Sequence, residues 1–546
     1  MPLLHQLSTI LVAAALYCAS ARSSDPEIRT PAGTFRGKVL TSHSGYEFES
    51  YRGIPYALPP TGQRRFALPV RHPVIGHKDG TVIGQEDCLF LNVFRPLRSQ
   101  VESEDAELKK VFVFIHGGGF VVGASDPYLP GDLVTRGDLI VVTMNYRLNW
   151  FGFLRGNSGY LPGNQGFWDQ LLSLQWIRDN IRSFGGDPDD VTISGESAGS
   201  LSTSLLSVSP LAKGLFTKAV LLSGTTEILP TSPHTSNDYL QKASNKYGCG
   251  SGSVDGNEEA VVRCLKQLPA ETFVTDFGFD PTISATSSGD DLLPKPFAEI
   301  LNDTDFLSEV GFYNRDYIVS ITADDGDIMT SARFGVIDVT SQKHSLEGLS
   351  PWLGLPSRVA ELVLNEYQNI YGDLKKSVTA LTTDITFLKA SVSFVETYTR
   401  QPRKQSNPDK NAYLMSFDHS PRYVPDQYML HALDLAYLFD LNTKEFIENF
   451  YYIELEDKFY EEDIQLKADY IDLIAAFIKT GNPNKYLTEQ KNVVWSPFDP
   501  ETKGYLSFSL QPSVKKDILG NRRVIWETLL PRWLQEQQQS GAREDL

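Results

Sequence analysis

The chain has few cysteines, fewer basic than acidic residues, and no long apolar run beyond its N-terminus. Only four cysteines and nine histidines occur among 546 residues, and they do not cluster as zinc ligands do. Acidic residues outnumber basic ones by 68 to 50, and the net charge of −18 excludes the basic footprint of a nucleic-acid-binding protein. Because no run of about 18 apolar residues follows, we expect no transmembrane segment. A hydrophobic fraction of 41% and a charged fraction of 22% exclude a disordered chain.

The N-terminal residues have the pattern of a secretory signal. A short apolar run at 7–17 is followed by Ala19, Ser20 and Ala21, which fit the small residues of a cleavage site. We expect residues 1–21 to be a signal peptide and the protein to be secreted; a buried N-terminal helix is the alternative. The final residues 543–546, REDL, are similar to a retrieval signal, so the lumen of the endoplasmic reticulum is an alternative location.

Two cysteines lie close enough in the sequence to pair in an oxidising compartment. Cys249 and Cys264 enclose 14 residues, and closing a loop of that size is worth about 3 kcal/mol in the entropic model. Cys18 leaves with the signal peptide, so Cys88 is expected to be a free thiol or an intermolecular link. Asn302 begins Asn-Asp-Thr, an acceptor sequence for N-glycosylation.

Short apolar runs rich in β-branched residues alternate with a helical pattern. The runs lie at 89–94, 111–115, 139–144, 191–194, 218–222 and 317–321. Between two of them, apolar residues from 168 to 184 recur at spacings of three and four and stop at Gly185 and Gly186. Strands that are apolar on both faces and alternate with helices predict an α/β fold, with a mostly parallel sheet covered on both sides.

A candidate nucleophile, Ser197, lies in Gly-Glu-Ser-Ala-Gly at 195–199, directly after the predicted strand 191–194. In this G-x-S-x-G pattern a sharp turn between strand and helix lifts the serine Oγ above the sheet, and glycines leave room on both sides. The helix N-terminus that follows favours developing negative charge. An ordinary connection between strand and helix is the alternative interpretation.

A glycine loop that suits an oxyanion follows another predicted strand. His116 and the three glycines 117–119 come directly after 111–115, and glycine backbone N–H groups can approach a substrate closely. A tetrahedral intermediate needs two or three such donors, and we expect the N–H groups of Gly118, Gly119 and Ala198 to supply them. No Lys-Ser or Lys-Thr pair follows, which excludes a P-loop. A flexible loop without this role is the alternative.

The base and the acid should follow Ser197, because enzymes with a nucleophile elbow have the chain order serine, acid, histidine. The candidate bases are the downstream histidines His234, His344, His419 and His431. The candidate acids follow strand 317–321 and are Asp324, Asp325 and Asp327. The residues alone do not distinguish among the three aspartates.

Several longer motifs occur together and in order. They are YRGIPYA at 51–57, EDCLFLN at 86–92, FGGDP at 184–188, GESAG at 195–199, GNP at 481–483 and WSP at 495–497. From about 27 to 533 the chain therefore resembles the type-B carboxylesterase/lipase family, the cholinesterase-like α/β-hydrolases. The resemblance implies a single α/β-hydrolase domain over 22–546 that needs no metal or cofactor.

The resemblance also implies roles for individual residues. Ser197 matches the nucleophile, His431 the base and Asp325 the acid of the family's catalytic triad. Glu196 matches the acidic residue before the nucleophile, and Ser223 matches a serine near the triad. Further matches concern the scaffold: the ion pairs Arg65–Glu86 and Arg147–Asp169, and the disulfide Cys249–Cys264.

One segment departs from the family pattern. Cys88 normally pairs with an earlier cysteine, and cholinesterases place a choline-binding tryptophan in the loop between them. Residues 52–87 contain neither cysteine nor tryptophan, and the stretch 59–85 is shorter than in the family. This departure argues against choline esters as substrates.

We expect a secreted serine hydrolase that acts on small-molecule or lipid esters. A lipase of the bile-salt-activated type, acting on acylglycerols or sterol esters, is the main alternative within the enzyme class. A catalytically silent, neuroligin-like adhesion protein is a second alternative, and a stoichiometric scavenger that is acylated but slow to deacylate is a third.

Overall fold

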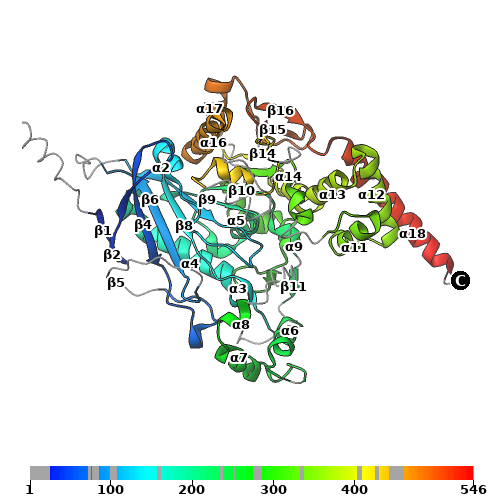
Figure 1. The fold of residues 1–546 in the computed structure, drawn as a ribbon, viewed down its shortest axis with the longest axis horizontal. Coiled ribbons are helices and arrows are strands. Elements are labelled where there is room, and N and C mark those ends of the chain that lie inside the picture. Colours follow the sequence, from blue (N-terminus) through cyan, green and yellow to red (C-terminus); the bar gives the residue numbers. More distant parts are fainter. Residues whose placement is uncertain are drawn as a thin grey trace, which may run out of the picture.

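An eleven-stranded sheet runs through the centre of the molecule, and helices lie on both of its faces (Figure 1). The computed structural model describes residues 25–71, 75–76, 85–98, 107–156, 161–229, 231–233, 238–250, 252–274, 286–331, 337–401, 409–422, 424, 429–441 and 460–544. The predicted signal peptide, His234, part of the shortened stretch 59–85 and the last two residues lie outside these ranges.

The sheet is mixed, and its centre is parallel. In spatial order its strands are β16 (Ser513–Lys516), β15 (Gly504–Phe508), β14 (Ala412–Phe417), β13 (Asp316–Thr322), β10 (Lys218–Leu222), β9 (Gly186–Glu196), β7 (Lys109–Ile115), β8 (Ile140–Met144), β6 (Phe90–Pro96), β4 (Glu47–Pro55) and β3 (Lys38–Thr41). The seven strands from β15 to β8 pair in parallel, and the strands at both edges pair antiparallel. The mostly parallel sheet predicted from the sequence is confirmed, and all six predicted runs are strands.

Strand β7 shows why these runs are apolar throughout. Its residues Val113 and Ile115 pack into the core on one face of the sheet, and Phe112 and Phe114 pack into the core on the other. All four side chains are fully buried. A strand covered on both faces needs apolar residues at every position, which is the pattern in the sequence.

The helices come from distant parts of the chain, and some of them cover the two faces of the sheet. Their bounds are α2 (Gly131–Gly137), α3 (Asn149–Phe153), α4 (Gln165–Asn180), α5 (Ala198–Val208), α6 (Asp238–Tyr247), α7 (Glu258–Gln267), α8 (Glu271–Val274), α9 (Phe297–Ile300), α10 (Thr304–Glu309), α11 (Gln342–Leu353), α12 (Ser357–Tyr371), α13 (Leu374–Thr382), α14 (Lys389–Thr399), α16 (Glu461–Thr480), α17 (Asn484–Tyr486) and α18 (Leu530–Glu544). Helices α4 and α5 pack on one face, and α2 and α16 on the other. The predicted helix at 168–184 is α4 plus a 3-10 turn, and it ends at Gly185, whose φ is 83°.

Short strands lie outside the main sheet. They are β1 (Glu27–Thr30), β2 (Gly33–Arg36) and β5 (Ile75–Gly76) in one small sheet, and β11 (Thr231–Pro233) and β12 (Thr286–Ser288) in another. The predicted disulfide Cys249–Cys264 is present and joins α7 to the segment after α6. The scaffold ion pairs Arg65–Glu86 and Arg147–Asp169 are also present, each at 2.6 Å.

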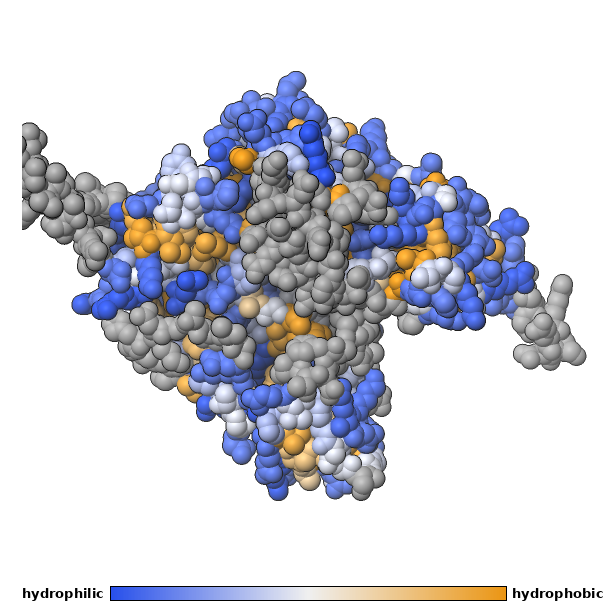
Figure 2. All heavy atoms as spheres, viewed as in Figure 1, coloured by the Kyte–Doolittle hydropathy of each residue, from blue (hydrophilic) through white to orange (hydrophobic). Residues whose placement is uncertain are grey.

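The viewed surface is mostly hydrophilic, with hydrophobic side chains in separate patches (Figure 2). This agrees with the net charge of −18. Within the described ranges, one helical stretch, Leu374–Thr399, is long and apolar enough to cross a membrane. Because 78% of its apolar window is buried inside the molecule, the stretch has the surroundings of a core helix.

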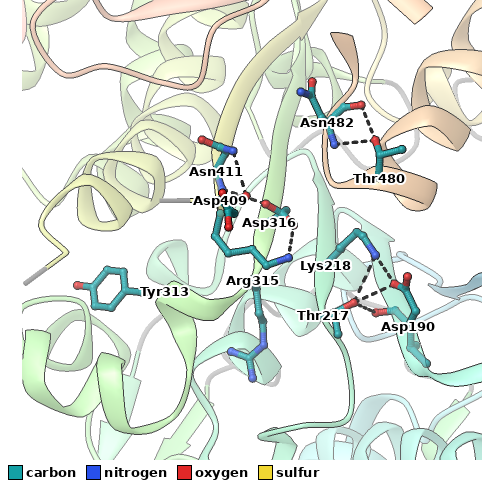
Figure 3. A network of polar contacts seen from close by, with 12 residues as sticks. Asp190, Thr217, Lys218, Tyr313, Arg315, Asp316, Asp409, Asn411, Thr480 and Asn482 are labelled. Atoms are coloured by element: carbon teal, nitrogen blue, oxygen red, sulfur yellow. Dashed lines mark hydrogen bonds and ion pairs between the residues drawn. The ribbon is translucent and has the colours of Figure 1, made fainter. Parts of the chain in front are cut away.

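A polar network joins the amino-terminal ends of neighbouring strands (Figure 3). Lys218, the first residue of β10, pairs with Asp190, which also accepts a hydrogen bond from the Thr217 hydroxyl at 3.1 Å. Asp316, the first residue of β13, accepts from the backbone N–H of Asn411 at 3.0 Å. These contacts hold together the amino-terminal ends of the strands. The predicted catalytic residues lie at the opposite end of the sheet, because they follow the carboxyl ends of the strands.

Candidate active site

Ser197 lies at a tight turn between β9 and α5. Its φ and ψ are 55° and −122°, a conformation that residues with a side chain rarely adopt. The backbone N–H of Ser197 donates to the Leu222 carbonyl at 2.9 Å, which holds the turn against β10. A Cβ at Gly195 would overlap the backbone of Gly199, and a Cβ at Gly199 would overlap the Ile115 carbonyl. Only glycine fits at positions 195 and 199, so the strained turn at Ser197 explains the two glycines of the G-x-S-x-G pattern.

The glycine loop after β7 lies directly against this turn. A Cβ at Gly117 would lie 3.1 Å from Ser197 Cβ and 2.7 Å from Glu196 Oε2. Gly118 and Gly119 have φ values of 104° and 63°, and a Cβ at Gly118 would overlap the Val122 carbonyl. The loop therefore brings glycine backbone up to the candidate nucleophile, and Ala198 is the first residue of the helix beside it.

His431 and Asp325 are brought together although 106 residues separate them. His431 Nδ1 lies 2.8 Å from Asp325 Oδ1, and both side chains are fully buried. The carboxylate of Asp324 accepts instead from the Met429 backbone N–H at 2.9 Å. Asp327 is buried, and burial raises its pKa to about 6. Of the three candidate aspartates, Asp325 is the one that contacts the histidine.

The other described histidines have different partners. His344 is half-exposed and pairs with Asp338 at 3.2 Å on the surface. His419 is buried beside Asp463, with 2.9 Å between Nε2 and Oδ1. His431 is thus the candidate histidine that lies in the site.

Asp325 is held by two hydroxyl groups besides the imidazole. The Ser223 hydroxyl donates to Oδ1 at 2.9 Å, and the Thr322 hydroxyl donates to the same oxygen at 2.7 Å. The Thr322 backbone N–H donates to Oδ2 at 3.1 Å. These bonds stabilise the ionised carboxylate and fix the oxygen that faces His431. Sequence reasoning found Ser223 but not Thr322, which ends β13.

Glu196 occupies the other side of the imidazole. His431 Nε2 lies 3.0 Å from Glu196 Oε1, and the glutamate is buried. Burial alone would lower the pKa of His431, but the carboxylates of Glu196 and Asp325 outweigh it and raise that pKa. Burial raises the pKa of Glu196, and the facing histidine opposes that shift. The two groups form one tightly coupled pair.

Two further residues of the site were not predicted. Asp434 is fully buried, and burial together with Glu196 and Asp325 raises its pKa to about 8. The sequence held a usable signal, since Asp434 is a charged residue within the apolar run ALDLAYLF at 432–439. Phe387 packs on His431 with ring centroids 4.8 Å apart, and no local pattern indicates this contact.

The remaining predicted residues lie outside this site. Asn302 is exposed at the end of α9, as a glycosylation acceptor must be. Cys88 is a free thiol, and burial raises its pKa to about 12. Among the described residues, no group of three or more His, Cys, Asp or Glu side chains has the arrangement of a metal site.

Comparisons with known proteins identify the family. The family model described as Carboxylesterase family matches residues 24–81 and 71–526. The medium-chain fatty acyl-CoA hydrolase precursor of Anas platyrhynchos is 30% identical over 96% of this chain and 96% of its own length. Cocaine esterase of Homo sapiens is 29% identical over 99% of both chains. Acetylcholinesterase-1 of Trittame loki is 37% identical over 54% of this chain and 60% of its own length. The chain therefore belongs to the carboxylesterase family, a family of carboxylic ester hydrolases.

Proposed function

We propose that this protein hydrolyses carboxylic esters through an acyl-enzyme on Ser197, with His431 as the base and Asp325 as the acid. The observation that carries the proposal is the buried bond between His431 Nδ1 and Asp325 Oδ1, while Nε2 lies 3.0 Å from Glu196, the residue before the serine of the strained turn. That bond holds the imidazole in the tautomer whose Nε2 can accept a proton. The neighbouring glycine loop supplies a place for the negative charge that the reaction creates.

The reaction follows from these positions. Ser197 Oγ attacks the ester carbonyl and gives its proton to His431 Nε2, and the carbonyl oxygen becomes an oxyanion. Backbone N–H groups of Gly118, Gly119 and Ala198 stabilise that oxyanion. His431 then protonates the leaving alcohol, and afterwards takes a proton from the water that releases the acid.

Glu196 controls the proton on His431 in this proposal. Nδ1 donates to Asp325, and Nε2 lies 3.0 Å from Glu196 Oε1, so the charge on Glu196 acts directly on the protonation of Nε2. In the neutral imidazole Nε2 carries a single lone pair, and this lone pair accepts the proton of Ser197 Oγ. When Nε2 has taken the serine proton, an ionised Glu196 stabilises the imidazolium.

Small-molecule or lipid esters are the proposed substrates, and secretion is the proposed fate. Relatives named for acyl-CoA and for cocaine hydrolysis support a broad range of acyl and leaving groups. The apolar run and small residues at 7–21 support a signal peptide. The disulfide Cys249–Cys264 supports an oxidising compartment.

The test is hydrolysis of p-nitrophenyl esters from acetate to palmitate by the wild type and by Ser197→Ala. We expect steady turnover by the wild type and a loss of about 10⁵- to 10⁶-fold in the variant, the scale for removing an activated nucleophile. A short-chain optimum indicates a carboxylesterase and a long-chain optimum a lipase. A burst without turnover indicates a scavenger. A folded wild type with neither burst nor turnover refutes the proposal.

A further inference from the structure

A π-helix interrupts the long buried helix beside the candidate site. The continuous helix Leu374–Thr399 consists of α13, the π-helical segment η7 (Thr383–Leu388) and α14. Bonds from i to i+5 are less favourable than those of an α-helix, and such segments are frequent at functional sites. Within η7, Asp384 is fully buried, receives the Tyr367 hydroxyl and pairs with Arg522 at 3.2 Å. The segment is therefore anchored through Asp384 to Tyr367 of α12 and to Arg522.

The first residue of η7, Thr383, bonds to the loop that carries Asp325. The backbone N–H of Gly326 donates to the Thr383 hydroxyl oxygen at 2.8 Å. The Thr382 hydroxyl lies 3.0 Å from the Gly326 carbonyl, but its single proton has a nearer acceptor in the Val378 carbonyl at 2.7 Å. The single hydroxyl proton of Thr383 goes to the Thr379 carbonyl at 2.8 Å, so a lone pair faces Gly326. The backbone N–H of the residue after Asp325 is thus held by this helix.

The approach is close enough to require glycine at 326. A Cβ there would overlap the Thr382 hydroxyl and the Thr383 backbone nitrogen. Any side chain would push Asp325 away from the helix, since the helix is anchored on its far side. The position of the carboxylate that faces His431 therefore depends on this contact.

The same segment contacts the histidine through an aromatic ring. The Phe387 and His431 ring centroids are 4.8 Å apart with an interplanar angle of 31°, and Phe387 is buried. The two ring nitrogens of His431 lie 2.8 Å from Asp325 and 3.0 Å from Glu196. The phenyl ring covers a face of the imidazole, so it limits rotation out of the plane in which these nitrogens bond.

We propose that η7 is a positioning element of the site, in which the Thr383 hydroxyl holds Asp325 through Gly326 and the Phe387 ring holds the plane of His431. Neither residue touches a reacting atom, so both are positioning residues. The inference rests on the proposed function for its kinetic readouts. It goes beyond that function, because it assigns tasks to residues outside the triad and the glycine loop.

The test compares Thr383→Val with Thr383→Ser. Valine keeps the shape but leaves the buried Gly326 N–H without its acceptor, whereas serine keeps the oxygen. We expect kcat for a p-nitrophenyl ester to fall about 10- to 100-fold in Thr383→Val, the scale for a small misplacement of catalytic groups. KM should change less than about threefold, because the substrate contacts remain. Thr383→Ser should stay within a few-fold of the wild type.

The matched control lies in the same segment. Thr386 is buried in η7, and its hydroxyl has no hydrogen-bond partner among the described residues. Thr386→Val makes the same chemical change but removes no hydrogen bond to the acid loop, so kcat should remain close to the wild-type value. Phe387→Leu is the second variant; it keeps an apolar side chain but removes the aromatic face, and it should lower kcat with little change in KM.

Two further readouts separate positioning from general packing. The carboxylates of Glu196, Asp325, Asp327 and Asp434 all act on His431. When Asp325 moves away in Thr383→Val, the pKa of His431 falls, and the acidic limb of kcat/KM shifts to lower pH. The downfield proton resonance of the bond between His431 Nδ1 and Asp325 should also broaden or shift in Thr383→Val and not in Thr386→Val.

Three results would overturn the proposal. The first is a folded Thr383→Val with wild-type kcat, pH profile and downfield resonance. The second is equal damage in Thr383→Val and Thr383→Ser, because the hydroxyl would then not matter. The third is equal damage in Thr386→Val. If the folded wild type does not turn over esters, the proposed function fails, and the resonance still decides whether Thr383 holds the bond between Asp325 and His431.

Discussion

Replacing Glu196 by glutamine removes one charge beside the imidazole with little change in shape. At 3.0 Å from His431 Nε2, a full charge in surroundings of effective dielectric constant near 20 contributes roughly 5 kcal/mol to the stability of the imidazolium. Burial raises the pKa of Glu196 and so disfavours its charged form, although the facing histidine opposes this shift. We therefore expect a smaller effect, a fall of about 1–3 units in the pKa of His431.

The sign of the effect on the pH profile follows from this shift. In the wild type the imidazole must lose its proton before it can act as a base, so kcat/KM falls as the pH drops through the pKa of His431. A lower pKa in Glu196→Gln moves this acidic limb to lower pH by about 1–3 units. The plateau of kcat/KM should fall about 10-fold, because the imidazolium of the transition state loses a stabilising charge.

The assay is the pH dependence of kcat/KM for a p-nitrophenyl ester, and Asp434→Asn is the matched control. Asp434 is buried among the same groups, but its pKa of about 8 leaves it neutral below that pH. Its replacement should therefore move the acidic limb much less than Glu196→Gln. An unmoved limb in Glu196→Gln, or one that moves to higher pH, would refute the assignment of Glu196 as the group that sets the proton affinity of His431.

Two further predictions concern the glycine loop and the free cysteine. Gly118→Ala places a Cβ against the Val122 carbonyl at a φ of 104°, so kcat should fall about 10²- to 10³-fold, the cost of one lost oxyanion donor. Gly45→Ala has a similar φ of 85° but open space around its Cβ, and it should keep wild-type kcat. Cys88, with a pKa raised to about 12, should react with a thiol reagent at pH 8 roughly 10³-fold more slowly than an exposed cysteine, because only the thiolate is nucleophilic. Rapid labelling of the native chain, and equal labelling before and after denaturation, would contradict this.

The central strands and the nucleophile turn could be predicted because their determinants are local. Strand β7 needs apolar residues at every position, and the turn at Ser197 needs glycine on both sides. Each requirement leaves a pattern within a few residues. The strands β14 and β15 were not predicted, although β14 is fully buried. Neither strand is next to a motif of the site or to a helical pattern that the sequence analysis identified.

The choice of acid and the positioning residues depend on contacts between distant segments. Thr383 bonds to Gly326 across 57 residues, and Phe387 packs on His431 from another helix. Neither threonine nor phenylalanine in an apolar helix differs visibly from core residues. The apolar run after His431 does not form a regular α-helix: Ala432 has a φ of 67°, and a short 3-10 helix, Leu433–Tyr437, follows.

Strand register explains why the serine and the acid need a third residue between them. One level of the sheet joins Glu196 on β9, Leu222 on β10, Ser320 on β13 and Met415 on β14. Since β10 separates β9 from β13, residues at this level on the two strands lie about 10 Å apart, twice the spacing of neighbouring strands. A serine and a carboxylate at that separation do not touch. The imidazole lies between them, with Nδ1 on Asp325 and Nε2 toward the end of β9.

The histidine reaches this place from beyond β14, and the neighbouring aspartates divide the work of holding it there. Asp325 binds the ring itself, while the carboxylate of Asp324 accepts the Met429 N–H at 2.9 Å. The backbone N–H of Asp324 in turn lies 3.3 Å from the Met429 carbonyl. Asp324 therefore fastens the loop two residues before His431 to the loop that carries the acid. The two neighbouring aspartates, which the sequence alone does not distinguish, therefore have different tasks. Asp325 binds the imidazole, and Asp324 aligns the two loops by binding the backbone N–H of Met429.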